Sequence, residues 1–189
     1  SNQTTNGVIT RNTVYGNGLG GSFRNGIFIA ACSPEVSRNK VYDNYRNISI
    51  EGWSAATTSP TVKNNLIYEV SETVEKGIYV YANHASAVVS PYIYHNTIDL
   101  CKDGIAIALG ENGGTSAPQI KYNIVTNSNE VGIRNNSANP TVTYNDVWNT
   151  QNYSGFEVDP SPNILSDPKY ASYSLQSDSP CIDAIPTGA

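Results

Sequence analysis

One short pattern recurs along the chain, and it constrains the fold more than any other feature. The pattern is apolar-x-x-Asn-x-apolar, and its copies recur at a period of about 26 residues. A repeat of this length indicates stacked supersecondary units, because a single unit cannot bury its apolar face alone. The asparagines of the six copies are Asn12, Asn39, Asn65, Asn96, Asn123 and Asn145.

The residues around each asparagine predict three short strands per repeat. A proline stands two residues before the first apolar position in five copies, where it opens a strand without the loss of a needed N–H. Each copy is followed by a Gly-apolar-x-apolar segment, such as Gly77-Ile78-Tyr79-Val80, or by a close variant of that segment. Because Asn47 replaces this glycine in one repeat, we expect a positive φ there, which Gly and Asn tolerate best. The pattern predicts an all-β solenoid, a parallel β-helix of about seven coils.

The recurrent asparagine has a structural role in such a stack. Its side-chain amide can bond to the equivalent amides in the coils above and below, so the six asparagines are expected to form an internal ladder. Removal of one rung leaves its neighbours without partners, and Asn65 and Asn96 in the middle of the stack should be the most sensitive.

Composition excludes several classes of function. Charged residues make up 14% of the chain and the net charge is −5, which argues against a nucleic-acid partner. No apolar run approaches the ~18 residues of a membrane span, and no signal-peptide pattern opens the sequence. Cys32, Cys101 and Cys181 fit no zinc or redox spacing, and we expect small buried side chains.

The motifs Pro-x-Val-x-x-Asn-x-Val-Tyr and Gly-Ile-x-Ile resemble the repeats of right-handed, single-stranded parallel β-helix proteins that act on carbohydrates outside the cell. That group includes pectate and alginate lyases, polygalacturonases, alginate epimerases and non-catalytic surface proteins. The segment from Asp167 to Ala184 resembles the part that closes such helices. The resemblance covers nearly the whole chain, and it implies an extracellular or cell-surface location.

This resemblance suggests a division into coils at residues 1–162 and a closing coil with a cap at residues 163–189. The first coil starts almost directly at Val8-Ile9, so we expect the N-terminal cap to be absent and further coils or a capping helix to precede Ser1 in a longer protein. The module should be a monomer or one part of a longer multidomain chain.

Ligands of this fold usually lie across the outward residues of the first strands, by analogy. One outward row should run from Phe28 through Ser49, Tyr79, Ala106 and Arg134 to Glu157, and the next from Ala30 through Glu51, Tyr81 and Ala108 to Asn136. The turns after three consecutive mid-stack strands are long, and they carry Trp53, His84 and Glu111. Long loops on a rigid scaffold are frequent places for function.

The expected substrate-binding residues are therefore Tyr79, Tyr81, Trp53, Glu51, Arg134 and Glu111. Structural roles compete with this hypothesis. Trp53 would then cover the side of the solenoid, His84 would be a solvated loop residue, and Arg134 would pair with Glu157 in the next coil. Other columns look structural, namely the aromatic column Tyr15, Tyr42, Tyr68 and Trp148 and the charge ladder Glu75, Lys102 and Glu130.

We favour a module that binds a polysaccharide without cleaving it. The main alternative is a lyase or epimerase that acts on a uronate polymer, with Arg134, His84 or Tyr79 as candidate catalytic residues. A third hypothesis is a passive surface stalk or adhesin. A glycosidase is disfavoured, because Glu51 and Glu157 would lie about 19 Å apart. No metal site is expected from the sequence, although calcium accompanies many lyases of the group.

Overall fold

The computed structural model describes residues 7–17, 24–70, 75–158 and 162–184. The described residues form 23 strands and no helix, so no helical segment among them could cross a membrane. Short Val- and Ile-rich runs bounded by Pro, Gly and Asn account for this all-β character.

Three six-stranded parallel sheets form the walls of the solenoid. The first sheet comprises β3 (Asn25–Ala30), β6 (Arg46–Gly52), β10 (Lys76–Ala82), β14 (Asp103–Leu109), β18 (Val131–Asn136) and β21 (Tyr153–Ser154). The second comprises β1 (Val8–Thr10), β4 (Glu35–Ser37), β8 (Thr61–Lys63), β12 (Tyr92–Tyr94), β16 (Gln119–Lys121) and β19 (Thr141–Thr143). The third comprises β2 (Thr13–Tyr15), β5 (Lys40–Tyr42), β9 (Leu66–Tyr68), β13 (Thr97–Asp99), β17 (Ile124–Thr126) and β20 (Asp146–Trp148).

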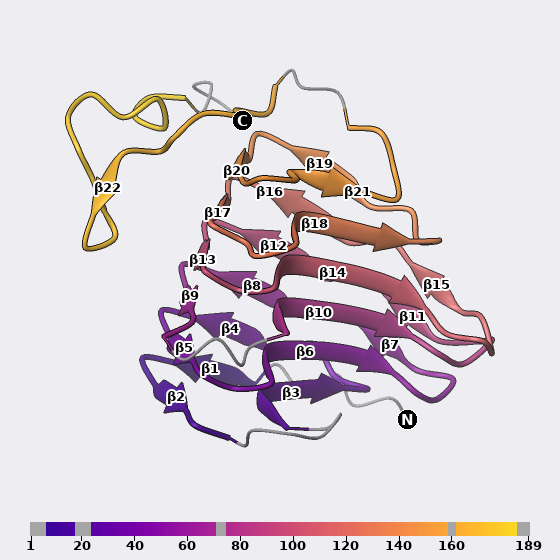
Figure 1. Cartoon of the computed structure of the whole chain (residues 1–189). Helices are drawn as coiled ribbons and strands as arrows, with labels where there is room; N and C mark the ends of the chain where they lie inside the picture. The colour runs from indigo at the N-terminus through magenta and orange to yellow at the C-terminus, as the bar shows by residue number, and fades with distance from the viewer. Residues whose placement is uncertain (1–6, 18–23, 71–74, 159–161, 185–189) are drawn as a thin grey trace.

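Figure 1 shows the strands of each sheet stacked in chain order from the first coil to the last. Each sheet has six strands where the sequence predicted about seven coils. The difference arises after β20, where the described residues add one more rung at Asn163 and a single bridge between Ile164 and Asp146, but no further complete coil.

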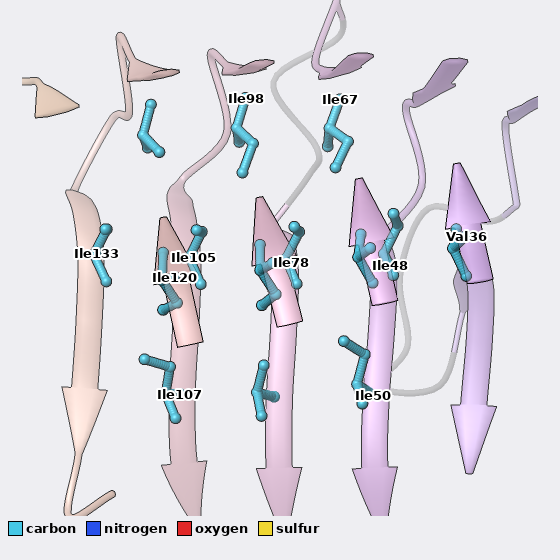
Figure 2. Close-up of a cluster of buried hydrophobic side chains, with 14 of the residues drawn as sticks. Val36, Ile48, Ile50, Ile67, Ile78, Ile98, Ile105, Ile107, Ile120 and Ile133 are labelled. Atoms are coloured by element: carbon cyan, nitrogen blue, oxygen red, sulfur yellow. The ribbon is translucent and has the colours of Figure 1, made fainter. Parts of the chain in front are cut away.

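The interior is a column of aliphatic side chains that repeats from coil to coil. Ile48, Ile78, Ile105 and Ile133 of the first sheet lie one above another and are fully buried (Figure 2). Side chains of the other two sheets, such as Ile67 and Ile98, meet them from across the core. Because parallel strands pair in register, each coil buries its apolar residues against their equivalents.

The asparagine ladder is confirmed. The side-chain Nδ2 of each of the five asparagines from Asn12 to Asn123 donates to Oδ1 of the next at 2.9–3.1 Å, and Asn145 donates to Asn163 at 3.3 Å. The same Oδ1 atoms accept the backbone N–H of the preceding rung, as between Asn65 and Asn96 at 3.0 Å. The ladder therefore satisfies buried polar groups at the bend between the second and third sheets.

The positive φ predicted at the glycine of the first strand is wrong at four of the five glycines and at Asn47, and correct at Gly155, where φ is 83°. Gly26, Gly77, Gly104 and Gly132 do not have a positive φ. A Cβ at Gly77 would lie 2.5 Å from the carbonyl oxygen of Gly104 and 2.7 Å from Cγ2 of Ile98, so glycine is needed there for close approach. In the coil without this glycine, the Asn47 amide takes part in the corner, accepting from Nδ2 of Asn44 at 2.9 Å.

A left-handed residue instead recurs in each coil just before the ladder asparagine, although other residues such as Asp43 and Leu100 are left-handed too. The six residues at this place have φ between 54° and 58°. We call them the corner column: Arg11, Arg38, Asn64, His95, Tyr122 and Tyr144.

The two columns that looked structural are confirmed. The rings of Tyr15 and Tyr42 stack at 5.0 Å, and those of Tyr42 and Tyr68 at 4.9 Å, while Trp148 follows in the same register position. Nζ of Lys102 lies 3.9 Å from Glu75 and 3.4 Å from Glu130. All three cysteines are free, and Cys101 is fully buried.

The segment after the last coil lies along the third sheet rather than continuing the stack. Its hairpin, β22 (Tyr170–Ala171) and β23 (Ser174–Leu175), descends beside this sheet in Figure 1. The Tyr173 hydroxyl donates to Asp99 at 3.2 Å, and the Tyr170 hydroxyl contacts that of Thr126. The coils or cap expected before Ser1 lie outside the described residues.

Candidate functional site

The outer face of the first sheet carries the predicted rows, with one correction. Strand register places Phe28, Ser49, Tyr79, Ala106 and Arg134 in one row, and Ala30, Glu51, Tyr81, Ala108 and Asn136 in the next. The partner of Arg134 in the last strand is Ser154 and not Glu157. Gly155 adopts a φ of 83° directly after Ser154 and ends the strand, so Glu157 does not join the row.

Three aromatic side chains lie together on this face. The rings of Tyr79 and Tyr81 are 5.5 Å apart and nearly parallel, and the Trp53 indole meets Tyr81 edge-on at 5.3 Å. Trp53 follows β6 directly and remains 46% exposed, while both tyrosines are half-buried. We call Trp53, Tyr79 and Tyr81 the aromatic platform.

Glu51 lies beneath this platform and not at the surface. Its side chain is 1% exposed, and it accepts hydrogen bonds from the Ser49 hydroxyl at 2.5 Å and from the Trp53 indole N–H at 2.5 Å. Nη1 of Arg46 completes the cluster at 3.0 Å. The carboxylate therefore holds the indole in place, and a ligand on this face would meet Trp53 rather than Glu51.

Arg46 is a member of the site that the sequence analysis missed. Its guanidinium carbon lies 4.2 Å from the ring centroid of Tyr79, a cation–π contact. Arg46 precedes the Gly-apolar-x-apolar pattern, where the repeat specifies no residue type. Arg46 pairs in register with Lys76, and Lys76 with Asp103. An alignment of the repeats would therefore have shown charged residues at one position in three successive coils.

The platform tyrosines are proton donors at neutral pH. Burial raises the pKa of Tyr79 to about 12, although the nearby Arg46 charge opposes the shift. Burial also raises the pKa of Tyr81, followed by the repulsion of the Glu51 and Glu111 carboxylates. A hydroxyl with a raised pKa is poorly suited to abstract a proton, and well suited to donate a hydrogen bond.

Arg134 is held by a buried acid. Its Nε and Nη2 donate to the two oxygens of Asp103 at 3.0 and 2.9 Å, and Asp103 also binds Nζ of Lys76 at 2.6 Å. Arg134 further contacts Glu130 at 3.1 Å, so the pairing with Glu157 expected from the sequence is replaced. The hydrogen bonds that Arg134 donates to Asp103 raise the pKa of Arg134, which disfavours the neutral guanidine that a base would require.

The three long turns fold into a fourth, three-stranded sheet of β7 (Thr57–Thr58), β11 (Val88–Val89) and β15 (Thr115–Ser116). Glu111 is exposed at the tip of the last of these turns, and the Tyr81 hydroxyl reaches the same turn beside Gly110. In the second turn, Nδ1 of His84 accepts the backbone N–H of Ser86 at 3.2 Å. The fold thus brings Trp53, Tyr79, Tyr81 and Glu51 together and places Arg134 two strands away.

Metal ligands do not gather in the part of the chain that the structure describes. No three His, Cys, Asp or Glu side chains converge there in an arrangement that could hold an ion. A role for calcium therefore stays a prediction.

Comparison with known proteins addresses the fold. A family model described as a right-handed beta helix region matches residues 1–115, which cover the first coils and the aromatic platform. No curated protein and no solved structure matches the chain. Together with the in-register parallel sheets and the asparagine ladder, this match shows that the chain belongs to the right-handed β-helix family.

Proposed function

We propose that this chain is an extracellular module that binds a linear polysaccharide along the outer face of its first sheet. The observation that carries the proposal is the aromatic platform, in which an exposed indole is fixed by a buried carboxylate. Aromatic rings pack against the apolar faces of sugar rings, and Tyr hydroxyls and the indole edge supply polar contacts. A ring that is held before binding loses little conformational entropy when the ligand arrives.

The surroundings of the platform suit an extended ligand. Phe28 lies two strands before Tyr79 in the same row and is 51% exposed, and the guanidinium of Arg46 covers part of the Tyr79 ring. Adjacent strands stand about 4.8 Å apart, so a chain of sugars lying across the strands would meet Phe28 and the platform in turn.

The test is binding of the purified chain to polygalacturonate, alginate and neutral glucans, with and without calcium. Trp53→Ala should raise the Kd by about tenfold, which corresponds to ~1.4 kcal/mol of lost contact. Trp148→Ala is the matched control, because Trp148 is 44% exposed and lies on the third sheet. Equal affinities of the two variants would contradict the proposal.

A spectroscopic version of the experiment reports on the platform directly. The chain contains two tryptophans, so Trp148→Phe leaves Trp53 as its single indole fluorophore. Saturating polysaccharide should shift or quench this emission in Trp148→Phe. In Trp53→Phe, where Trp148 is the remaining indole, the emission should not respond.

The same preparations distinguish the two alternative functions. A lyase acting on a uronate polymer produces unsaturated ends that absorb in the ultraviolet, and Arg134→Ala or His84→Ala would abolish them. The ion pairs of Arg134 with Asp103 and the raised pKa of Tyr79 disfavour both residues as the base. A passive stalk would give neither product nor binding.

A further inference from the structure

The corner column combines an unusual backbone with large side chains. At each of its six places φ lies between 54° and 58°, a conformation that Gly and Asn adopt most easily. Only Asn64 is of such a type. At the other places the chain carries Arg, His or Tyr, and strain that is retained in this way is often associated with a function.

Three hollows lie beside this column, the first two on the outer face of the second sheet and the third against the third sheet and the tail. The first has a volume of about 490 Å³, the second about 320 Å³ and the third about 240 Å³. Tyr94 lines both the first and the second, and His95 and Tyr122 line both the second and the third. The first two hollows therefore meet at Tyr94 and form one groove, which spans about 19 Å from Arg11 to Tyr122 by strand spacing.

Aromatic rings line the later half of this groove. His95 stacks on Tyr122 at 5.2 Å, Tyr122 stacks on Tyr144 at 5.5 Å, and Tyr94 meets His95 edge-on at 5.3 Å. Tyr92, in the same strand as Tyr94, is 47% exposed. Burial of His95 lowers its pKa, so its ring is neutral at physiological pH and acts as a further flat surface.

Positive charge is concentrated in the same groove, in a chain whose net charge is −5. Arg11, Arg38, Lys63 and Lys121 line its first two hollows. Lys63 is neutralised by Glu35 at 2.9 Å. Within the described ranges the other three cations form no ion pair, so their charges face solvent.

We propose that this groove is a second binding surface, which takes a linear polymer of sugar acids. The sugar rings would lie against the exposed ring of Tyr92 and the edges of the stacked His95 and Tyr122 rings, and the carboxylates would meet Arg11, Arg38 and Lys121. The planar fork of arginine matches a carboxylate well, and the spacing of the coils presents one contact per coil. A nucleic acid fits less well, because three unpaired cations along the groove are fewer than the clustered Lys and Arg that neutralise a phosphate backbone.

This inference does not rest on the function proposed for the first sheet, because the two surfaces lie on different walls and share no residue. Their failures are distinguishable. Trp53→Ala tests the first wall, and substitutions in the groove test the second. Binding to the groove is best measured in the Trp53→Ala background, with polygalacturonate fragments as the probe and their fully methyl-esterified form as the uncharged counterpart.

Two substitutions separate a binding role from a structural one. Arg38→Asn and Tyr122→Asn each introduce the residue that the left-handed backbone prefers, so the folded state should lose little stability while binding weakens about tenfold. Lys121→Gln removes a charge from a regular strand and should weaken binding about threefold. Lys40→Gln is the matched control, because Lys40 is exposed on the third sheet.

The expected pattern is preference for the charged polymer over its ester, loss of affinity in the three groove variants, and weaker binding at higher salt. Affinities equal to that of Lys40→Gln in all three variants would overturn the proposal. Tighter binding of a single-stranded oligonucleotide, or of a sulfated glycan, than of polygalacturonate would overturn the choice of ligand.

Discussion

Two neighbouring residues form the bend before the third strand of each coil, and the role of only one of them can be recognised from the sequence. The ladder position needs a short side chain that both donates and accepts, so asparagine recurs and could be recognised. The residue before it needs only a left-handed backbone, which Arg38 and Tyr122 adopt although their types do not favour it. The ladder was therefore predictable, and the corner column was not.

Truncation of a central rung should cost far more than truncation of the first. Asn96 donates to the Asn123 amide and to the carbonyls of Val62 and Tyr94, and it accepts from Asn65. We expect Asn96→Ala to lower the free energy of unfolding by about 1–3 kcal/mol, because these buried partners are stranded. Urea denaturation of Asn96→Ala and the wild type gives the difference.

Asn12→Ala is the control for that measurement. Asn12 is exposed, so water can replace its bonds, and the loss should stay below about 1 kcal/mol. Similar losses at the two positions would show that the ladder does not act through buried hydrogen bonds.

The platform residues were predicted by type and register, but their partners were not. An acidic residue on an outward row is expected to be exposed. Glu51 and Asp103 are instead covered by Arg46, Lys76 and Arg134. These ion pairs depend on which long side chains fold back over the sheet, and the repeat pattern holds no information about that choice.

At the scale of strands, the first strand of each coil begins where two coils approach closely. The glycine at this place, such as Gly77, was predicted from the sequence, but the reason predicted for it was wrong. A positive φ and a lack of space for a Cβ both select glycine, and the sequence does not distinguish them. The fourth sheet could not be predicted, since β7, β11 and β15 have two residues each and show no alternation.

A methyl group at Gly77 should therefore be destabilising. Its Cβ would approach the backbone of Gly104 and the side chain of Ile98, which cannot move without a shift of the neighbouring coil. We expect Gly77→Ala to lower the free energy of unfolding, measured by urea denaturation, by about 1–3 kcal/mol. Gly7→Ala is the control, because its Cβ would lie 3.9 Å from Pro34, an ordinary contact. A neutral Gly77→Ala would mean that the coils can separate at this edge.

For the molecule as a whole, the solenoid followed from the repeat, and the position of its tail did not. Tyr170, Tyr173 and Cys181 are held by tertiary contacts to Thr126, Asp99 and Asp146, which no local pattern encodes. The Cys181 thiol donates to Asp146 Oδ2 at 2.8 Å and attaches the end of the described chain to β20.

The stability of the fold around Asp146 should depend on pH. Burial raises the pKa of Asp146 from 3.8 to about 6, with a smaller contribution from Asp167 and opposing hydrogen bonds from Cys181 and the Ser166 backbone. Because the folded state favours the protonated acid, the contribution to stability is complete below pH ~4 and is lost as the pH rises through about 6. We expect a loss of about 1–2 kcal/mol across this range.

Asp146→Asn should remove that dependence in denaturation curves recorded between pH 4 and 7.5, since the amide resembles the protonated acid. Asp167→Asn, at an exposed position nearby, should retain it. An unchanged slope in Asp146→Asn would exclude Asp146 as the titrating group.

The constant register between coils has a consequence for how such a protein can change its length. Insertions are confined to the turns, and the spacing of the ladder asparagines from Asn12 to Asn145 varies from 22 to 31 residues while the strands remain aligned. Tandem duplication of the gene segment for one coil would add one rung and one further place on each wall without disturbing the others. The length of the solenoid is thus a quantity that evolution, or an engineer, can adjust in whole coils.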